Sequence, residues 1–121
     1  MTDRRRLSVT PIGELAVVRF SDKKIVDSSN IEEMGAEMLA LVDIDHLKHI
    51  LLNFDGVEFL SSAALNKLIL MDKKVKQVGG VLRLCNLKAD IMEVFTITRL
   101  NRVFDIRKTD TEALKAFGVA P

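Results

Sequence analysis

The sequence holds one cysteine, two histidines and no tryptophan or tyrosine among its 121 residues. A single thiol excludes a disulfide bond within the chain, and so few thiols and imidazoles form too small a ligand set for a zinc site. All six aromatic residues are phenylalanine, which leaves no tryptophan or tyrosine on which bases or sugars could stack. We therefore expect no metal and no cofactor.

A predominance of charge of one sign is also lacking, because 18 lysine and arginine residues nearly balance 17 aspartate and glutamate residues. A net charge of +1 creates no long-range field for a polyanion, so we expect no nucleic-acid partner. No apolar run approaches the ~18 residues that a membrane-spanning helix requires, and no signal-peptide run follows the basic residues 4–6. The sequence predicts a cytoplasmic protein without direct membrane insertion.

The length and the 48% apolar and 29% charged composition are typical of one globular domain. We expect this domain over residues 7–117, with a flexible N-terminal tail at residues 1–6 and a C-terminal tail at residues 118–121. The first two strands are predicted at residues 7–12 and 15–20. Gly13 can supply the positive φ that a tight hairpin between them needs.

After this hairpin, helical and strand patterns alternate. Ile31, Met34 and Met38 lie on one stripe of a helix, and Ser29 or Asn30 precedes it as a possible N-cap. The predicted elements are a helix at about 31–42, a strand at 49–54, a helix at 62–78, a strand at 81–85, a helix at 89–97, a strand at 103–106 and a helix at 109–117. This order predicts a small α/β domain with a mostly parallel or mixed sheet of four to five strands.

The sequence contains no recognisable catalytic constellation. The phosphate-binding patterns GxxxxGK[ST] and GxGxxG do not occur. His46 and His49 fall on a turn and a strand start, where their side chains would diverge, and Cys85 ends an apolar strand as a buried, inert thiol. The Gly79-Gly80 pair follows a helix and is interpreted as its C-terminal stop. We predict that the protein is not an enzyme and has no catalytic residue and no metal ligand.

Residues 56–65 connect a buried strand to the start of a lysine-rich helix. Ser61 and Ser62 lie where a helix leaves its first N–H groups without partners. On one interpretation Ser61 is the N-cap and Ser62 a residue of the first turn. On the other, this exposed helix start is a protein-docking or phosphate-accepting surface, where a phosphoryl group would add about −1.5 to −2 charges.

The run from Gly56 to Leu65, continuing to Leu84, resembles the STAS domain of bacterial anti-sigma factor antagonists. A second similar block contains Ile91, Val94-Phe95, Thr98, Leu100, Val103-Phe104 and Ile106. The resemblance covers the chain from about Leu7 to Phe117. It implies a STAS-like α/β fold with an opening β-hairpin and about four helices packed on one side of the sheet.

Members of this family typically carry an Asp-Ser-Ser/Thr-Gly-Leu-Gly run at the start of the second helix, and its third residue is phosphorylated. Matched without gaps, Ala63 occupies the acceptor position, and Ser62 lies one residue before it as a substitute acceptor. Ala64 and Asn66 stand in the two glycine positions. The residues that the resemblance implies in partner binding are Asp27, Ser61, Ser62, Ala63, Ala64 and Asn66.

The resemblance implies a regulatory module that binds an anti-sigma factor with serine-protein kinase activity through the N-terminus of its second helix. With Ala63 at the acceptor position, such a module would no longer be phosphorylatable. The alternative is a STAS scaffold subunit of a larger signalling or membrane-transport complex. An enzyme or small-ligand binder is a third class, for which the sequence offers no polar cleft. The oligomeric state stays open.

Overall fold

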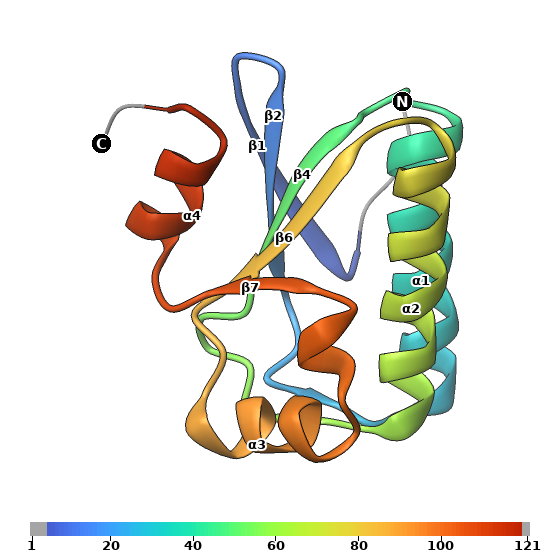
Figure 1. The fold of residues 1–121 in the computed structure, drawn as a ribbon. Helices are drawn as coiled ribbons and strands as arrows, with labels where there is room; N and C mark the ends of the chain where they lie inside the picture. The colour runs from blue at the N-terminus through green and yellow to red at the C-terminus, as the bar shows by residue number, and fades with distance from the viewer. Residues whose placement is uncertain (1–4, 120–121) are drawn as a thin grey trace.

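A five-stranded mixed sheet forms the centre of the molecule in the computed structural model, which describes residues 5–119 (Figure 1). The strand order is β1-β2-β4-β6-β7, with β1 antiparallel to β2 and all other neighbours parallel. The strands are β1 (Leu7–Ile12), β2 (Leu15–Phe20), β4 (His49–Asn53), β6 (Val81–Cys85) and β7 (Asp105–Arg107). The structure thus confirms the predicted opening hairpin and the mixed sheet, and Gly13 has the expected positive φ of 60°.

Four α-helices and one short 3₁₀ helix connect and cover these strands. They are α1 (Ser28–Asp43), α2 (Ser62–Gln77), α3 (Ala89–Ile97), η1 (Leu100–Arg102) and α4 (Asp110–Ala116). Helices α1 and α2 run side by side over one face of the sheet, and α3 lies at the end of the sheet near the N-termini of both (Figure 1). The parallel crossovers β2-α1-β4, β4-α2-β6 and β6-α3-β7 explain why helices and strands alternate in the sequence.

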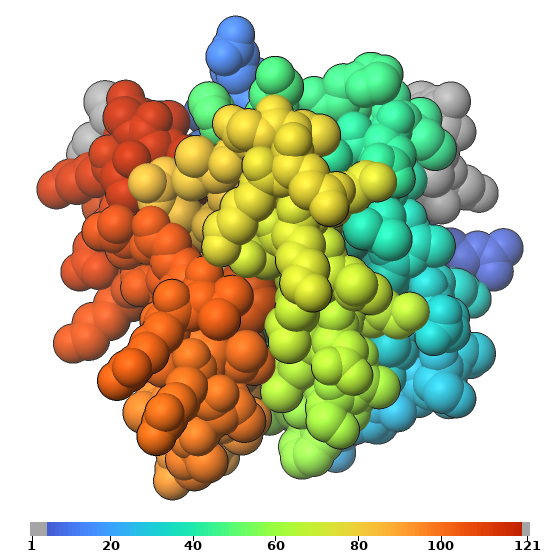
Figure 2. Space-filling view, turned by 45° about the vertical axis from the view of Figure 1, so that its right-hand side comes forward, coloured from blue at the N-terminus to red at the C-terminus, as the bar shows by residue number. Residues whose placement is uncertain are grey.

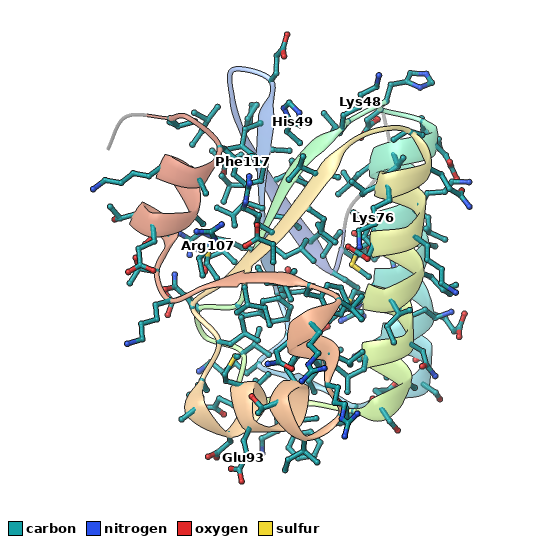
Figure 3. The ribbon with its side chains drawn as sticks, viewed as in Figure 1. Lys48, His49, Lys76, Glu93, Arg107 and Phe117 are labelled. Carbon is teal, nitrogen blue, oxygen red and sulfur yellow. The ribbon has the colours of Figure 1, made fainter. Side chains whose placement is uncertain are left out.

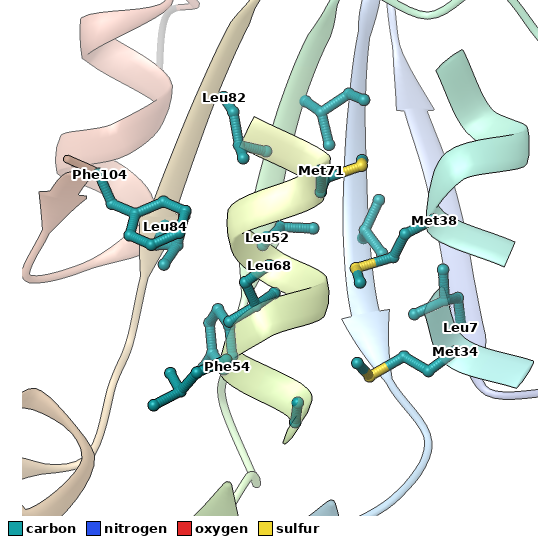
Figure 4. Packing of buried hydrophobic residues seen from close by; sticks show 14 of the residues in the cluster. Leu7, Met34, Met38, Leu52, Phe54, Leu68, Met71, Leu82, Leu84 and Phe104 are labelled. Carbon is teal, nitrogen blue, oxygen red and sulfur yellow. The ribbon is translucent and has the colours of Figure 1, made fainter. Parts of the chain in front are cut away.

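The main core lies between the sheet and helices α1, α2 and α3 (Figure 4). Every second residue of the central strands points to this face, as Ile50, Leu52 and Leu84 do, because side chains alternate along a strand. Met38 and Met71 reach into the same core from α1 and α2. Flexible methionine side chains adapt to the irregular space between two helices and a twisted sheet.

Helix α4 packs on the opposite face of the sheet, so the prediction that all the helices cover one side is wrong for this helix. Leu15, Val17 and Leu51 point away from the main core and form a second cluster with Ala113 of α4. The strands carry apolar residues on both faces, and a strand with two apolar faces needs cover on each. The same cluster buries Cys85 completely, and burial raises the pKa of this thiol to about 12.

The ends of the domain differ from the predicted tails. Arg6 donates from its backbone N–H to the Glu37 carboxylate at 3.1 Å, and its guanidinium contacts Glu33 and Asp22, each at 3.1 Å. Val119 packs against the second cluster. Arg6 and Val119 therefore belong to the folded domain, whereas the predicted tail residues 1–4 and 120–121 lie outside the described residues.

The Gly79-Gly80 pair ends α2 as predicted, but the two glycines are needed for different reasons. Gly79 has a φ of +74°, with open space where a Cβ would be. Gly80 lies against the backbone carbonyl of Lys48, which also accepts the Val81 N–H at 2.8 Å as β6 begins beside β4. A side chain at position 80 would therefore push apart two central strands.

We expect Gly80→Ala to destabilise the protein more than Gly79→Ala. The change at Gly79 introduces the strain of a left-handed alanine, about 1–2 kcal/mol. The change at Gly80 forces a backbone shift in the sheet, for which overpacking costs of about 3 kcal/mol are the nearest guide. Urea unfolding of the two variants measures the difference, and a Gly80→Ala protein as stable as its Gly79→Ala counterpart would contradict this account.

Candidate functional site

A two-stranded parallel sheet, separate from the main one, joins the segment before α1 to the segment before α2. Its strands are β3 (Lys24–Ile25) and β5 (Phe59–Leu60). The pairing is extended by the Ser61 N–H, which donates to the Ile25 carbonyl at 3.1 Å. The sequence did not reveal these strands, because two residues are too few to establish an alternating pattern. The pairing places the N-termini of α1 and α2 next to each other.

Asp27 is the N-cap of α1, so the expectation of Ser29 or Asn30 in this role is wrong. One carboxylate oxygen of Asp27 accepts from the Ser29 N–H at 3.0 Å, the Ser29 hydroxyl at 2.6 Å and the Asn30 N–H at 3.2 Å. The hydrogen bond from the Ser29 hydroxyl, together with the two backbone N–H groups, lowers the pKa of Asp27. A carboxylate that stays ionised therefore lies exposed beside the start of α2.

Ser61 is the N-cap of α2, as predicted, and its hydroxyl accepts from the Ala64 N–H at 3.3 Å. Ser62, Ala63 and Asn66 are exposed on the first turns of α2. Figure 2 shows this helix between α1 and α3 on the surface. Ala64 is completely buried in the main core. The prediction that Ala64 contacts a partner is therefore wrong for its side chain, which is buried. This small side chain instead allows α2 to pack closely on the sheet.

The two helix starts differ in charge. The start of α2 leaves N–H groups and the positive end of its dipole with no acidic residue in its first turn, whereas the start of α1 carries the ionised carboxylate of its N-cap Asp27. One turn further along, Lys67 of α2 contacts Glu32 of α1 at 3.2 Å. This exposed ion pair links the two helices close to their N-termini.

The residues considered for catalysis or metal binding do not converge. Within residues 5–119 no group of three or more His, Cys, Asp or Glu side chains is arranged to hold a metal ion. His46 lies exposed in a turn with a φ of 56°, whereas the His49 ring lies 6.2 Å from the ring of Phe117, on the α4 side of the sheet (Figure 3). At the α2 N-terminus, the exposed residues Ser62, Ala63 and Asn66 do not form a pair of groups for acid–base chemistry.

An apolar pocket that the sequence did not reveal adjoins this surface. It has a volume of ≈ 180 Å³ and lies between β5, the first turns of α2 and α3. Its apolar lining consists of Phe59, Leu60, Leu65, Ile91, Val94 and Phe95, and Glu58 and Asp90 complete it. A signal was available in the sequence, since Phe59 is a large apolar residue two positions before the N-cap Ser61, outside any periodic pattern.

Comparison with known proteins agrees with this architecture. The family model of the STAS domain matches residues 7–113, which is most of the chain. The chain therefore belongs to the STAS domain family. Within the part of the chain that the structure describes, no helix is both long and apolar enough to cross a bilayer.

Several relatives of the chain are described as anti-sigma factor antagonists. It is 34% identical over 96 residues to a Bordetella bronchiseptica protein assigned as an anti-sigma factor antagonist, BtrV, covering 79% of this chain and 82% of the relative. An anti-sigma factor antagonist (STAS) domain protein from Planctomyces limnophilus has a similar structure, with a TM-score of 0.82 and 25% identity over 93% of this chain and 97% of the other. Phosphorylated SpoIIAA from Bacillus shares the fold, with a TM-score of 0.70, 19% identity and coverage of 92% and 98%.

We expect Ser61→Ala to destabilise the protein by about 1 kcal/mol, because it removes the oxygen that accepts the Ala64 N–H. The matched control is Ser62→Ala, which removes a hydroxyl one residue further on without touching the cap and should leave stability nearly unchanged. Thermal or urea unfolding measures both. Equal effects of the two substitutions would show that the hydroxyl of Ser61 does not cap the helix.

Proposed function

We propose that this protein is an anti-sigma factor antagonist that acts by binding an anti-sigma factor with serine-kinase activity. The partner contacts the exposed first turns of α2 and the neighbouring N-terminus of α1. Binding occupies the anti-sigma factor and so releases its sigma factor for transcription. The protein catalyses no reaction in this process.

The observation that carries the proposal is the side-by-side placement of the two helix N-termini by the β3–β5 pair. Ser62, Ala63 and Asn66 are exposed there, and Asp27 adds an ionised carboxylate. The same region of the sequence carries the resemblance to the family's phosphorylated run. Support also comes from the 34% identity to a protein assigned as an anti-sigma factor antagonist.

A binding experiment tests the proposed surface. The protein is mixed with each anti-sigma factor kinase encoded in the genome of its source, and complexes are measured by calorimetry. We expect one of them to bind, and we expect Asn66→Arg to weaken that complex by about tenfold or more, because a bulky cation would be buried against the partner. The control Gln77→Arg places the same side chain on an exposed residue at the other end of α2.

Two outcomes would contradict the proposal. Equal weakening by Asn66→Arg and Gln77→Arg would exclude the N-terminus of α2 as the contact surface. Failure of every kinase to bind the unmodified protein would exclude the antagonist function. In that case, a large assembly of copies of this chain with other proteins would favour the scaffold role instead.

Phosphorylation provides an independent prediction. We propose that Ala63 occupies the acceptor position and that the protein is therefore not phosphorylated by its partner kinase. Intact-mass measurement after incubation with kinase and ATP should show no change for the natural sequence. The Ala63→Ser variant should gain one phosphoryl group, because position 63 is exposed and accommodates a hydroxyl. A phosphoryl group on the natural protein that is lost in Ser62→Ala would instead make Ser62 the acceptor.

A further inference from the structure

The apolar pocket beside the α2 N-terminus has the size and charge of an anchor site. We propose that it receives one large apolar side chain, phenylalanine or leucine, from a protein segment in which that residue is flanked by arginine or lysine. The inference deepens the proposed function and rests on it in one respect: the segment is taken to belong to the partner that contacts the start of α2.

The volume of the pocket limits its occupant. At ≈ 180 Å³ it is smaller than the roughly 300 Å³ at which pockets for drug-sized ligands begin. It is close to the roughly 150 Å³ of an engineered apolar cavity that binds a single benzene ring. One aromatic or leucine side chain therefore fits, whereas a nucleotide or an organic cofactor does not.

Two of the apolar residues that line the pocket are exposed to solvent. Phe59 is 54% exposed and Val94 is 40% exposed, and both line the pocket. Ile97, at the last residue of α3, is 72% exposed. Clustered apolar residues left in water at one end of a small domain are typical of a surface that a partner covers.

The rim of the pocket carries two carboxylates, of which Asp90 lies at the positive end of the α3 dipole. Glu58 and Asp90 complete the lining, which contains no basic residue. Neither carboxylate makes an ion pair or a side-chain hydrogen bond with any residue in the described range 5–119. Glu93, which like Asp90 belongs to α3, points outward from this helix (Figure 3). Lys88, the N-cap of α3, is the nearest basic residue along that helix and lies outside the lining.

Two other acidic residues of the domain are instead paired with cations. Asp105 lies between Arg83 at 2.9 Å and Arg107 at 2.7 Å, and Asp72 contacts Lys76 at 2.8 Å. The carboxylates at the pocket thus remain available to a cation from outside. A cation on each side of an apolar anchor would meet one of them, and complementary rim charges of this kind speed association and fix orientation.

The pocket is continuous with the docking surface at α2. Phe59 and Leu60 precede the N-cap Ser61, and Leu65 lies one turn inside the helix. A partner that covers Ser62 and Ala63 therefore passes the mouth of the pocket. Buried aromatic anchors in such pockets supply a large share of binding energy in many interfaces, while flanking contacts exclude water.

Titration with three blocked tripeptides tests the inference without any natural partner. The isotope-labelled protein is followed by amide chemical shifts while Arg-Phe-Arg, Arg-Ala-Arg or Glu-Phe-Glu is added. We expect Arg-Phe-Arg to shift the amides of residues 58–65 and 90–95. We expect Arg-Ala-Arg to bind about tenfold or more weakly, because it lacks the apolar anchor. Glu-Phe-Glu should bind roughly three- to tenfold more weakly than Arg-Phe-Arg at low salt.

Variants of the protein distinguish charge-dependent peptide binding from nonspecific peptide binding. The double substitution Glu58→Gln and Asp90→Asn should remove the preference for Arg-Phe-Arg over Glu-Phe-Glu while leaving the folded spectrum unchanged. The control is Glu14→Gln, which neutralises an exposed carboxylate that has no ion pair within residues 5–119 and lies in the hairpin turn at the opposite end of the domain. Equal binding of all three peptides, or shifts centred outside the pocket, would overturn the inference.

The two proposals fail in distinguishable ways. Selective peptide binding together with no kinase complex would keep the anchor site and refute the antagonist function. A kinase complex disrupted by Asn66→Arg, together with no peptide preference, would keep the antagonist function and refute the anchor site. If a kinase complex forms, Val94→Glu should weaken it more than the control Glu14→Gln does. The glutamate at position 94 would place a charge in the pocket that is proposed to receive the apolar side chain.

Discussion

The short pairing of β3 with β5 determines where the proposed binding surface lies. It consists of two residue pairs in register, Lys24 with Phe59 and Ile25 with Leu60, and it is extended by the Ser61 N–H bonded to the Ile25 carbonyl. Ile25 is 1% exposed, so the pairing is also fixed by burial in the main core. Without it, the caps Asp27 and Ser61 would belong to two loops with no fixed relation. With it, two helices start from one small sheet, and their N–H groups face the same region of solvent.

The two faces of the main sheet serve different purposes in this domain. Most of the apolar burial lies under α1, α2 and α3, and the face under α4 holds a smaller cluster. At the edge of that cluster the Arg83 guanidinium lies 4.3 Å from the ring centre of Phe117 and also contacts Asp105. These groups satisfy one another within the domain, which is typical of structural packing. At the end of the domain around α3, by contrast, the exposed apolar residues Phe59, Val94 and Ile97 lie near the carboxylates Glu58 and Asp90.

The sequence predicted the long elements well because each carries a repeated signal. Helices α1 and α2 have four turns of apolar spacing, and the strands β2, β4 and β6 are almost continuously apolar. The predicted N-cap Ser61 and the stop at Gly79-Gly80 follow from local chemistry alone. The side of the sheet on which α4 packs could not be predicted in this way. Helix α4 covers the face of the sheet that the other helices leave open, which is the face that carries Leu15, Val17 and Leu51.

The functional site was only partly predictable for the same physical reason. Ser62, Ala63 and Asn66 are neighbours in the sequence, so their exposure at one helix start could be expected. The contribution of Asp27 depends on the β3–β5 pair, whose two-residue strands have no periodicity. The pocket requires β5, α2 and α3 to meet, and it combines Phe59 with Val94, which are 35 positions apart. Contacts of this range follow from the completed topology and cannot be predicted from any local pattern.

The charges at this end of the domain differ between neighbouring places. The start of α2 has N–H groups and no acidic residue in its first turn, whereas the pocket next to it has the carboxylates Glu58 and Asp90 and no basic residue in its lining, and the start of α1 carries the carboxylate of Asp27. For a segment that binds here as proposed, cations favour the pocket and Asp27, and acceptor groups favour the start of α2. The reversed orientation would place cations against the N–H groups of α2 and acidic groups against carboxylates, which is unfavourable at both places. Charge on this surface therefore favours one orientation of the proposed partner by repulsion as well as by attraction.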